Sequence, residues 1–362
     1  MITSNQAEKL FLIGRPFSFI YACLMSLRRR LYGRGILKAR KLSCPVISIG
    51  NLSLGGTGKT PHVVSICSFL KNRGYRPCIL TRGYGGKAGR GPVVVSDGKD
   101  IMASAKMAGD EPWMMASQLE GVPVVAGSDR YRCGQYAIKH FRPSVFVLDD
   151  GFQHIRLYRD IDLVLMEAPN PFGSGHVFPG GTLRESPKAL SLADAVILTK
   201  CNEMPFNMLE LVEEEIRPFM EGQPIFRSFY QLASIEIVCG EKLKKLDSNN
   251  LSNYHFFCFC GLARPDSLTK LLTNSGVKVT GSIWFPDHHF YSQKDLKRIG
   301  EMARLKGCSI VLTTEKDFAK ILVDQWDKIN RKISLAVVNI DVGLPQSFWH
   351  FLTCRLEGSG PI

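Results

Sequence analysis

The segment SIGNLSLGGTGKTP, from Ser48 to Pro61, places several glycines directly before a Lys-Thr pair. Backbone N–H groups of a glycine-rich turn at a helix N-terminus can surround phosphate oxygens. A lysine there can bridge the β- and γ-phosphates, and a threonine hydroxyl can ligate Mg²⁺. This spacing therefore predicts a nucleotide-phosphate site. Its expected contacts are Gly55, Gly56, Thr57, Gly58, Lys59 and Thr60.

The match to the phosphate-loop pattern GxxxxGK[ST] lacks one glycine, because Ser53 stands at the first glycine position. An apolar strand before the loop and a helix after it supply the context that phosphate binding requires. A glycine turn with a purely structural role is the alternative. Two other nucleotide-binding classes fit less well. Leu54 stands where partition-type ATPases carry a lysine, and the TKCN segment ends in Asn202 instead of the aspartate that reads guanine.

Two acidic pairs stand where they can assist phosphate chemistry. Asp149 and Asp150 end the apolar run SVFVLDDG, and carboxylates at that place can hold a hydrated magnesium ion. Asp110 and Glu111, in GDEP, are candidates for a general base or a metal ligand. The structural alternatives are an ordinary turn for the first pair and a helix cap by Asp110 for the second.

Two further polar clusters interrupt apolar surroundings. TRGYGG, from Thr81 to Gly86, follows a predicted strand, where loops face the ligand crevice of an open α/β sheet. FPDHHF, from Phe285 to Phe290, carries two histidines that can orient a base or bind a metal. Alternatively, they lie at the surface with their hydrogen bonds already made.

Short β-branched runs alternate with helical patterns from Pro45 onward. Runs without polar alternation are typical of a parallel sheet covered on both faces. We therefore predict an α/β fold: a P-loop NTPase-like doubly wound parallel sheet, a smaller C-terminal α/β domain and an N-terminal membrane-associated helix. The strands expected in the main sheet lie in PVISIGN, RPCILTRG, GVPVVAG, SVFVLDDG, IDLVLMEA and ADAVILTK.

Changes in composition predict the domain boundaries. The stretch GEKLKKLDSNNLSN is polar and charged, which is typical of a linker, and apolar runs resume beyond it. We predict a membrane-interface segment at 1–43, a phosphate-loop core at 44–238, a linker at 239–253 and a smaller α/β domain at 254–362.

The N-terminus carries much of the net charge of +13, with nine lysines and arginines against one acid in residues 1–41. About twelve mostly apolar residues, Pro16–Leu27, would span roughly 18 Å as a helix, well short of a ~30 Å hydrocarbon core, and Arg15-Pro16 interrupts any longer span. The basic block follows the apolar run, unlike a signal peptide. We expect a helix in the membrane interface, with its basic cluster drawn to anionic lipids. A helix packed on the protein's own core is the alternative.

The eleven cysteines show no disulfide framework and no CxxC spacing, which favours a reducing cytoplasm. Although the sequence pI is about 9.2, the basic excess lies beside an apolar helix and no nucleic-acid-reading motif is present. We therefore expect no nucleic-acid partner, and nothing implies an obligate protein partner.

Taken together, these motifs resemble the tetraacyldisaccharide 4'-kinase (lipid A 4'-kinase) family of Gram-negative bacteria, from the apolar N-terminus to about Asp317. The segments that carry the resemblance are SIGNLSLGGTGKTP, TRGYGG, GDEP, LDDGFQH, FPGGTLRES, FCGLARP, FPDHH and TTEKD. It implies a kinase at the cytoplasmic face of the inner membrane. The implied reaction moves the γ-phosphoryl group of ATP to the 4'-hydroxyl of a tetraacylated glucosamine disaccharide 1-phosphate.

The resemblance also implies roles for single residues. Asp110 would be the base, paired with His288, and His289 is the alternative partner. The acids associated with magnesium or the active site are Glu111, Asp149, Asp150 and Glu185. The arginines expected to neutralise phosphate charge are Arg82, Arg130 and Arg184. A nucleotide-dependent switch ATPase, which would release free phosphate, is the competing function.

Overall fold

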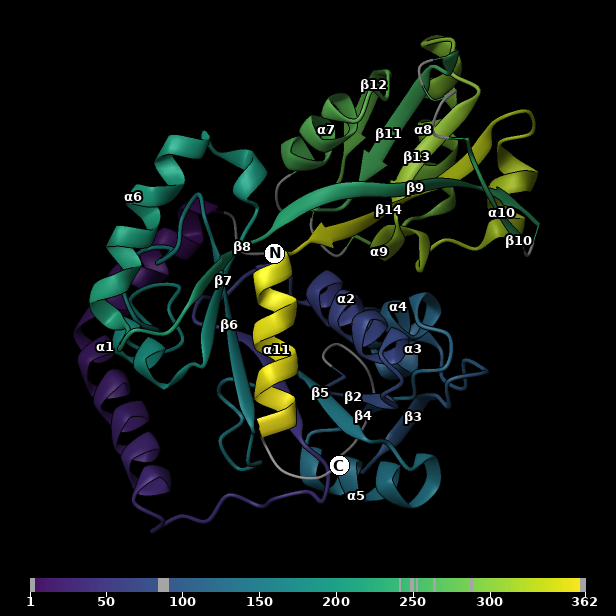
Figure 1. The fold of residues 1–362 in the computed structure, drawn as a ribbon. Helices are drawn as coiled ribbons and strands as arrows, with labels where there is room; N and C mark the ends of the chain where they lie inside the picture. Colours follow the sequence, from purple (N-terminus) through teal and green to yellow (C-terminus); the bar gives the residue numbers. More distant parts are fainter. Residues whose placement is uncertain are drawn as a thin grey trace. The chain divides into compact units, whose positions relative to one another are not determined.

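The computed structural model describes residues 4–83, 91–240, 242–247, 251, 253–262, 265–286 and 289–358, with side chains from residue 11 onward. The described chain divides into two compact units (Figure 1). The first consists of Met1–Phe229 together with Gly343–Ile362, and the second of Tyr230–Val342.

An eight-stranded sheet forms the centre of the first unit, in the order β3-β4-β2-β5-β1-β6-β7-β8. Neighbouring strands are parallel except for β3 and β4, which are antiparallel. All six predicted strands form, and β3 and β8 extend the sheet beyond them. The bounds are β1 Val46–Asn51, β2 Pro77–Thr81, β3 Val93–Ser96, β4 Val124–Ala126, β5 Val145–Asp149, β6 Ile161–Glu167, β7 Ala195–Thr199 and β8 Ile225–Arg227.

Helices cover both faces of this sheet, which explains why its strands are apolar on both sides. Ile47 and Ile49 of β1 pack in one core cluster with residues of α2, α4 and α11, whereas Val46 packs in another with residues of α5. The mixed α/β fold with parallel sheets is therefore confirmed. The helices of this unit are α1 Ser4–Gly33, α2 Lys59–Asn72, α3 Ala105–Ala108, α4 Asp110–Gln118, α5 Arg130–Phe141, α6 Phe206–Ile216 and α11 Gln346–Gly358, with 3₁₀ turns at Pro187–Leu192, Cys201–Glu203 and Arg217–Phe219.

The second unit holds a six-stranded sheet in the order β10-β9-β14-β13-β11-β12. Its strands are β9 Phe229–Cys239, β10 Lys242–Lys245, β11 Phe256–Cys260, β12 Val279–Trp284, β13 Ile310–Thr314 and β14 Ser334–Gly343. Its helices are α7 Pro265–Asn274, α8 Gln293–Leu305, α9 Glu315–Phe318 and α10 Val323–Ile329.

The boundary between the units differs from the predicted linker at 239–253. The chain passes from one unit to the other at Tyr230 and returns at Gly343. The lysine-rich residues that suggested a linker form β10, an exposed edge strand paired antiparallel with β9. Charged side chains protect an exposed sheet edge, so the polar composition reflects an edge and not a connection.

Helix α1 has two different faces. Exposed apolar side chains lie at helical spacing on one of them: Ile13, Phe17, Ile20, Leu24 and Leu27. The other face packs on the first unit. Gly14 lies so close to Pro179 that a Cβ would overlap its carbonyl, and the Ser18 hydroxyl accepts a hydrogen bond from the Gly180 N–H at 2.9 Å.

The helix runs through Pro16 without a break. Among the described residues, no helix combines the length and the apolar character that crossing a membrane requires.

Candidate active site

The loop between β1 and α2 has the backbone of a phosphate cradle. Gly55 and Gly58 adopt φ angles of 127° and 81°, which L side chains rarely reach. Open space lies where a Cβ of Gly55 or Gly56 would project. The Leu54 N–H donates to the Thr182 carbonyl at 2.6 Å, which fixes the start of the loop against a distant segment. A phosphate can therefore approach the backbone beside the N-terminus of α2.

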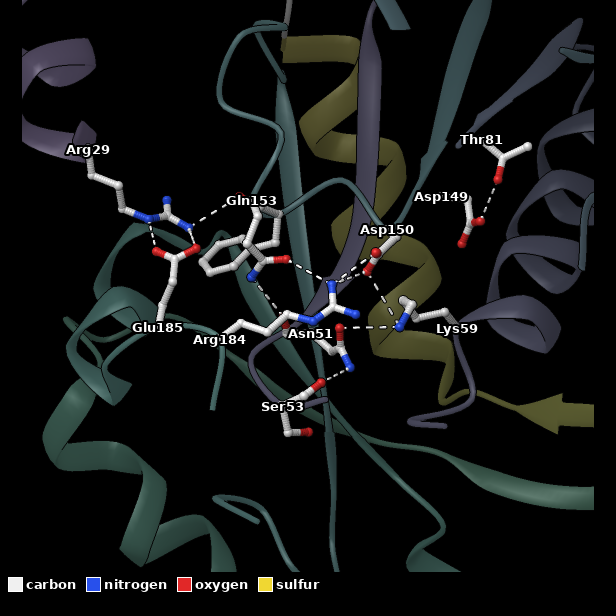
Figure 2. Close-up of polar contacts among 11 residues, drawn as sticks. Arg29, Asn51, Ser53, Lys59, Thr81, Asp149, Asp150, Gln153, Arg184 and Glu185 are labelled. Carbon is white, nitrogen blue, oxygen red and sulfur yellow. Dashed lines mark hydrogen bonds and ion pairs between the residues drawn. The ribbon is translucent and has the colours of Figure 1, made fainter. Parts of the chain in front are cut away.

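Lys59, the first residue of α2, has its ammonium group held from two sides (Figure 2). Its Nζ lies 3.2 Å from Oδ1 of Asn51, at the end of β1, and 3.5 Å from Oδ1 of Asp150. The Asn51 amide donates in turn to the Ser53 carbonyl at 2.6 Å. The lysine is thus oriented at the loop before any phosphate arrives.

Asp150 connects this lysine to Arg184. Nη1 of Arg184 donates to both carboxylate oxygens of Asp150, at 2.8 and 2.9 Å, and to Oε1 of Gln153 at 3.3 Å. Burial opposes ionisation of Asp150, but the charges of Lys59 and Arg184 outweigh it and lower its pKa. Asp150 is therefore a carboxylate at neutral pH. Its φ of 53° turns the chain sharply just after β5.

Asp149, the last residue of β5, is 3% exposed and presents a buried oxygen. Oδ2 accepts a hydrogen bond from the Thr81 hydroxyl at 2.8 Å, whereas Oδ1 has no partner among the described residues. The pKa of Asp149 is raised to about 6, first by burial and then by the charge of Glu111, while the charge of Lys59 acts in the opposite direction. A buried carboxylate oxygen without a partner fits a cation.

Two arginines belong to the same electrostatic environment. Arg130 begins α5 and is 4% exposed, and its Nη1 reaches the Gly127 carbonyl at 3.4 Å. Burial lowers its pKa, which the charges of Asp149 and Asp150 oppose and that of Arg82 reinforces. Arg82 itself is exposed just after β2. The structure therefore brings the cationic and acidic predictions together at the carboxyl ends of β1, β2 and β5.

Asp110 and Glu111 form the first turn of α4. The residue at the cap position is Gly109, with φ of 98°, and no side chain caps the helix. The expected alternative, in which Asp110 only caps α4, is therefore wrong. The positive end of the helix favours negative charge at these two residues. Glu111 lies near enough to Asp149 to raise its pKa, which places this turn beside the site.

Glu185 forms an ion pair with helix α1. Its two oxygens accept hydrogen bonds from Nε and Nη2 of Arg29 in α1, and its side chain is almost fully buried. Arg29 also donates to the Phe152 carbonyl at 3.1 Å. In Figure 2 Glu185 turns toward Arg29 and away from Asp150 and Lys59. Both oxygens of Glu185 thus contact Arg29 in this structure, and its expected association with magnesium or the active site stays a prediction.

The predicted histidine lies in the second unit. His288 falls outside the described residues. Its neighbour His289 stacks on Phe285 and approaches Oδ2 of Asp295 at 3.2 Å, beside the capping box of α8. These contacts account for His289 as a structural residue.

Sequence reasoning missed several residues that support the site. Asn51 and Gln153 stand inside quoted motifs, but nothing in their spacing shows that they meet Lys59 and Arg184. His62 bonds the Gly58 carbonyl through Nδ1 at 2.7 Å and the Ser228 hydroxyl through Nε2 at 2.8 Å. Burial lowers its pKa to about 4, so the neutral ring donates to Gly58 and accepts from Ser228. Because Ser228 is distant in the sequence, no local pattern reveals this support.

Within the described part of the chain, no three His, Cys, Asp or Glu side chains come together as a metal site. Magnesium suits this arrangement because it usually takes one or two carboxylates and completes its coordination with water and phosphate. Asp149 and Asp150 at the end of β5, with Thr60 at the start of α2, therefore remain the residues predicted to hold it.

The chain is similar to known proteins that share one description. A family model described as tetraacyldisaccharide-1-P 4'-kinase matches residues 10–357. A tetraacyldisaccharide 4'-kinase of Desulfotalea psychrophila is 40% identical over 323 residues, which cover 88% of this chain and 90% of that protein. The enzyme of the same name from Syntrophus aciditrophicus is 39% identical over 349 residues, covering 94% and 92%.

The fold has a counterpart among solved structures. A crystal structure of LpxK from Aquifex aeolicus, in complex with ATP, superposes with a TM-score of 0.73 at 34% sequence identity. The match covers 94% of this chain and 97% of the other.

Proposed function

The chain belongs to the tetraacyldisaccharide 4'-kinase family, and we propose how its own residues perform that family's reaction. It is an ATP-dependent kinase of lipid A biosynthesis. The reaction moves the γ-phosphoryl group of ATP to the 4'-hydroxyl of a tetraacylated glucosamine disaccharide 1-phosphate.

One observation carries the assignment of the phosphate site. Lys59 is held between Asn51 and Asp150 at a glycine loop whose Cβ directions are open. Lys59 would move from Asp150 toward the β- and γ-phosphates when ATP binds at Gly55, Gly56, Thr57, Gly58 and Thr60. Arg184 would keep Asp150 in place, while Arg130 and Arg82 would add positive charge near the transferring group.

Asp149, Asp150 and Thr60 would hold the metal ion, and Glu111 is a further acid near this position. The partnerless Oδ1 of Asp149 is the feature that supports this placement. Bound there, Mg²⁺ would neutralise charge on the β- and γ-phosphates.

Asp110 would accept the proton of the acceptor hydroxyl. Its place in the first turn of α4, one residue from Glu111, supports this role because Glu111 acts electrostatically on Asp149. A carboxylate base needs only to be in place when the proton leaves. His288 would position Asp110, a role proposed from the resemblance alone.

Helix α1 would place the enzyme on the cytoplasmic face of the bacterial inner membrane. Its outer face is apolar and exposed, and an amphipathic helix binds the interface through such a face. Two residues of the basic block are only partly exposed, because Arg28 and Arg29 contact the Gln153 and Phe152 carbonyls. Arg30 is exposed and remains for anionic lipids. Sedimentation with anionic vesicles should weaken in a Phe17→Ser/Ile20→Ser variant, and unchanged binding would contradict this placement.

Product analysis tests the proposed function. The purified enzyme is incubated with γ-labelled ATP, Mg²⁺ and tetraacyldisaccharide 1-phosphate in neutral detergent micelles. We expect the label in the lipid. Label released only as free phosphate, with the lipid unlabelled, would favour the switch ATPase instead.

A further inference from the structure

A second polar cavity lies in the first unit, outside the phosphate loop. Its volume is about 720 Å³, and it lies between the segment after α1, the start of α5 and the loop after β5. Four basic residues line it: Lys38, Arg40, Arg132 and Arg156. Tyr32, in the last turn of α1, and Tyr131 contribute aromatic rings to the wall.

The charges that face this cavity are not balanced. Asp129 is its one acidic lining residue, and it lies 3.7 Å from Arg40 and 3.5 Å from Arg132. Neither Lys38 nor Arg156 forms an ion pair with a described residue. Two cations therefore remain to attract a ligand of opposite charge.

The positive charges around the cavity also affect the pKa of His154. His154 lines the cavity, and burial lowers its pKa to about 4 with further contributions from the charges of Arg130, Arg159 and Arg156. The ring is neutral at pH 7, when it can accept or donate a hydrogen bond without adding charge. A cavity with unpaired cations and neutral donors is suited to phosphate.

The cavity adjoins both the active site and the membrane helix. Arg130 lies in the chain between the lining residues Asp129 and Tyr131. Burial lowers its pKa, and the charges of Asp149 and Asp150 oppose this effect. Tyr32 belongs to α1, whose apolar face is exposed. A lipid that carries a phosphate at one end and the reacting hydroxyl at the other could contact all three regions.

We propose that the pocket lined by Lys38, Arg40, Arg132 and Arg156 binds a lipid-borne phosphate ester. The source that best suits its position is the 1-phosphate of the acceptor, and this choice rests on the proposed function. The headgroup of an anionic phospholipid has the same chemistry and is the second source. In the first case the pocket selects the substrate, and in the second it fixes the enzyme on the membrane.

The test removes the two unpaired cations. A Lys38→Gln/Arg156→Gln variant is compared with Lys106→Gln/Lys139→Gln, whose lysines are exposed in the same unit and do not line the pocket. Kinetics are measured in neutral micelles with the acceptor and with an analogue that lacks the 1-phosphate. We expect the KM for the phosphorylated acceptor to rise about tenfold or more, as loss of charge-assisted hydrogen bonds predicts. The KM for the analogue and for ATP should not change.

Vesicle binding separates the two sources without requiring turnover. Wild type and both variants are sedimented with phosphatidylcholine vesicles doped with either the acceptor or phosphatidic acid. Weaker binding of the pocket variant to the acceptor vesicles alone supports the 1-phosphate, and weaker binding to the phosphatidic acid vesicles supports the headgroup. If the pocket variant matches wild type in kinetics and on both vesicles, the proposal is overturned. Failure of the wild type to label any lipid would instead overturn the proposed function, and the vesicle result would still decide whether the pocket binds phosphate.

Discussion

Asn51 shows how a single buried amide can prepare a phosphate site. It accepts a hydrogen bond from Lys59 and donates one to the Ser53 carbonyl, so it links Lys59 to the glycine-rich loop. Since Asn51 is fully buried, water cannot replace either bond.

Replacement of Asn51 by alanine should therefore affect both stability and rate. The Ser53 carbonyl would lose its partner, which costs about 1–3 kcal/mol of unfolding free energy. Lys59 would lose one of the two side chains that orient its ammonium group, and we expect kcat to fall about tenfold or more. Urea unfolding and phosphate transfer measure the two effects, with Asn170→Ala, at an exposed position, as the control. Wild-type kcat in Asn51→Ala would contradict the role of this residue.

His62 predicts a pH dependence of stability. Its pKa is about 4 in the folded protein and near 6.5 in the unfolded chain, so between these values the unfolded state binds more protons. The folded state should lose stability as pH falls from 6.5 toward 4, by up to roughly 3 kcal/mol from this residue.

A His62→Asn variant, which keeps an amide donor for the Gly58 carbonyl, should lose less stability over the same range. Thermal unfolding at a series of pH values compares it with wild type and with His140→Asn, which changes an exposed histidine. Equal acid sensitivity in wild type and His62→Asn would show that His62 is not the titrating group.

At this scale the sequence predicts residue types better than partners. Lys59 is recognisable because it follows a glycine-rich loop, and Asp149 and Asp150 because they end an apolar strand. Both patterns are typical of phosphate-binding sites. The partnership of Glu185 with Arg29 is not recognisable, because it joins a helix to a loop far along the chain. Nor does any pattern indicate that Gln153 meets Arg184. Such pairs depend on tertiary packing, which no local spacing encodes.

Helix α1 is the element that connects the outer apolar surface with the site. Its inner face contributes Arg29, which contacts Glu185 and the Phe152 carbonyl and lies over the Phe152 ring at 4.4 Å. Glu185 is adjacent in the chain to Arg184, which holds Asp150. The position of α1 thereby supports the position of Lys59.

A double-mutant cycle tests this connection. Arg29→Met or Glu185→Leu alone leaves a buried charge unpaired and should cost about 3–5 kcal/mol of unfolding free energy, whereas the double variant should recover much of it. All three should lower kcat, since Arg184 loses its support, while Arg30→Met, at an exposed position, should not. Additive stability losses would show that the two residues do not act as a pair.

The sequence predicts most strands of the main sheet, but not every element of the fold. Buried parallel strands read as continuous apolar runs, so the sequence predicts six of the eight strands of the main sheet. The predicted linker includes the edge strand β10, because exposed edges and linkers share a polar composition. The return of α11 to the first unit was not foreseen, since its buried Phe348 and Leu352 carry no sign of which core they join.

For the whole molecule, the two units contribute differently. Every described residue of the proposed phosphate site lies in the first unit, whereas His288 belongs to the segment Tyr230–Val342. The role proposed for His288 is therefore assigned to a residue of the second unit.

The two adjacent histidines provide a matched test of that role. His288→Ala should lower kcat with little change in the KM for ATP, because the phosphate site lies in the first unit. His289→Ala should mainly lower stability, because this residue stacks on Phe285 and bonds Asp295. Steady-state kinetics and thermal unfolding of both variants separate the effects. A large loss of kcat in His289→Ala alone would exchange the two assignments.

The measurement that tests the central claim most directly is phosphate transfer to the lipid by Lys59→Met, at saturating ATP and acceptor. The control is Lys71→Met on the same helix, whose exposed ammonium group bonds only the Glu120 carbonyl among the described residues. We expect a loss of about 100-fold or more in kcat for Lys59→Met and none for Lys71→Met, because one preorganised donor to the transferring group typically contributes that much. Near wild-type transfer by a folded Lys59→Met would contradict the proposed site.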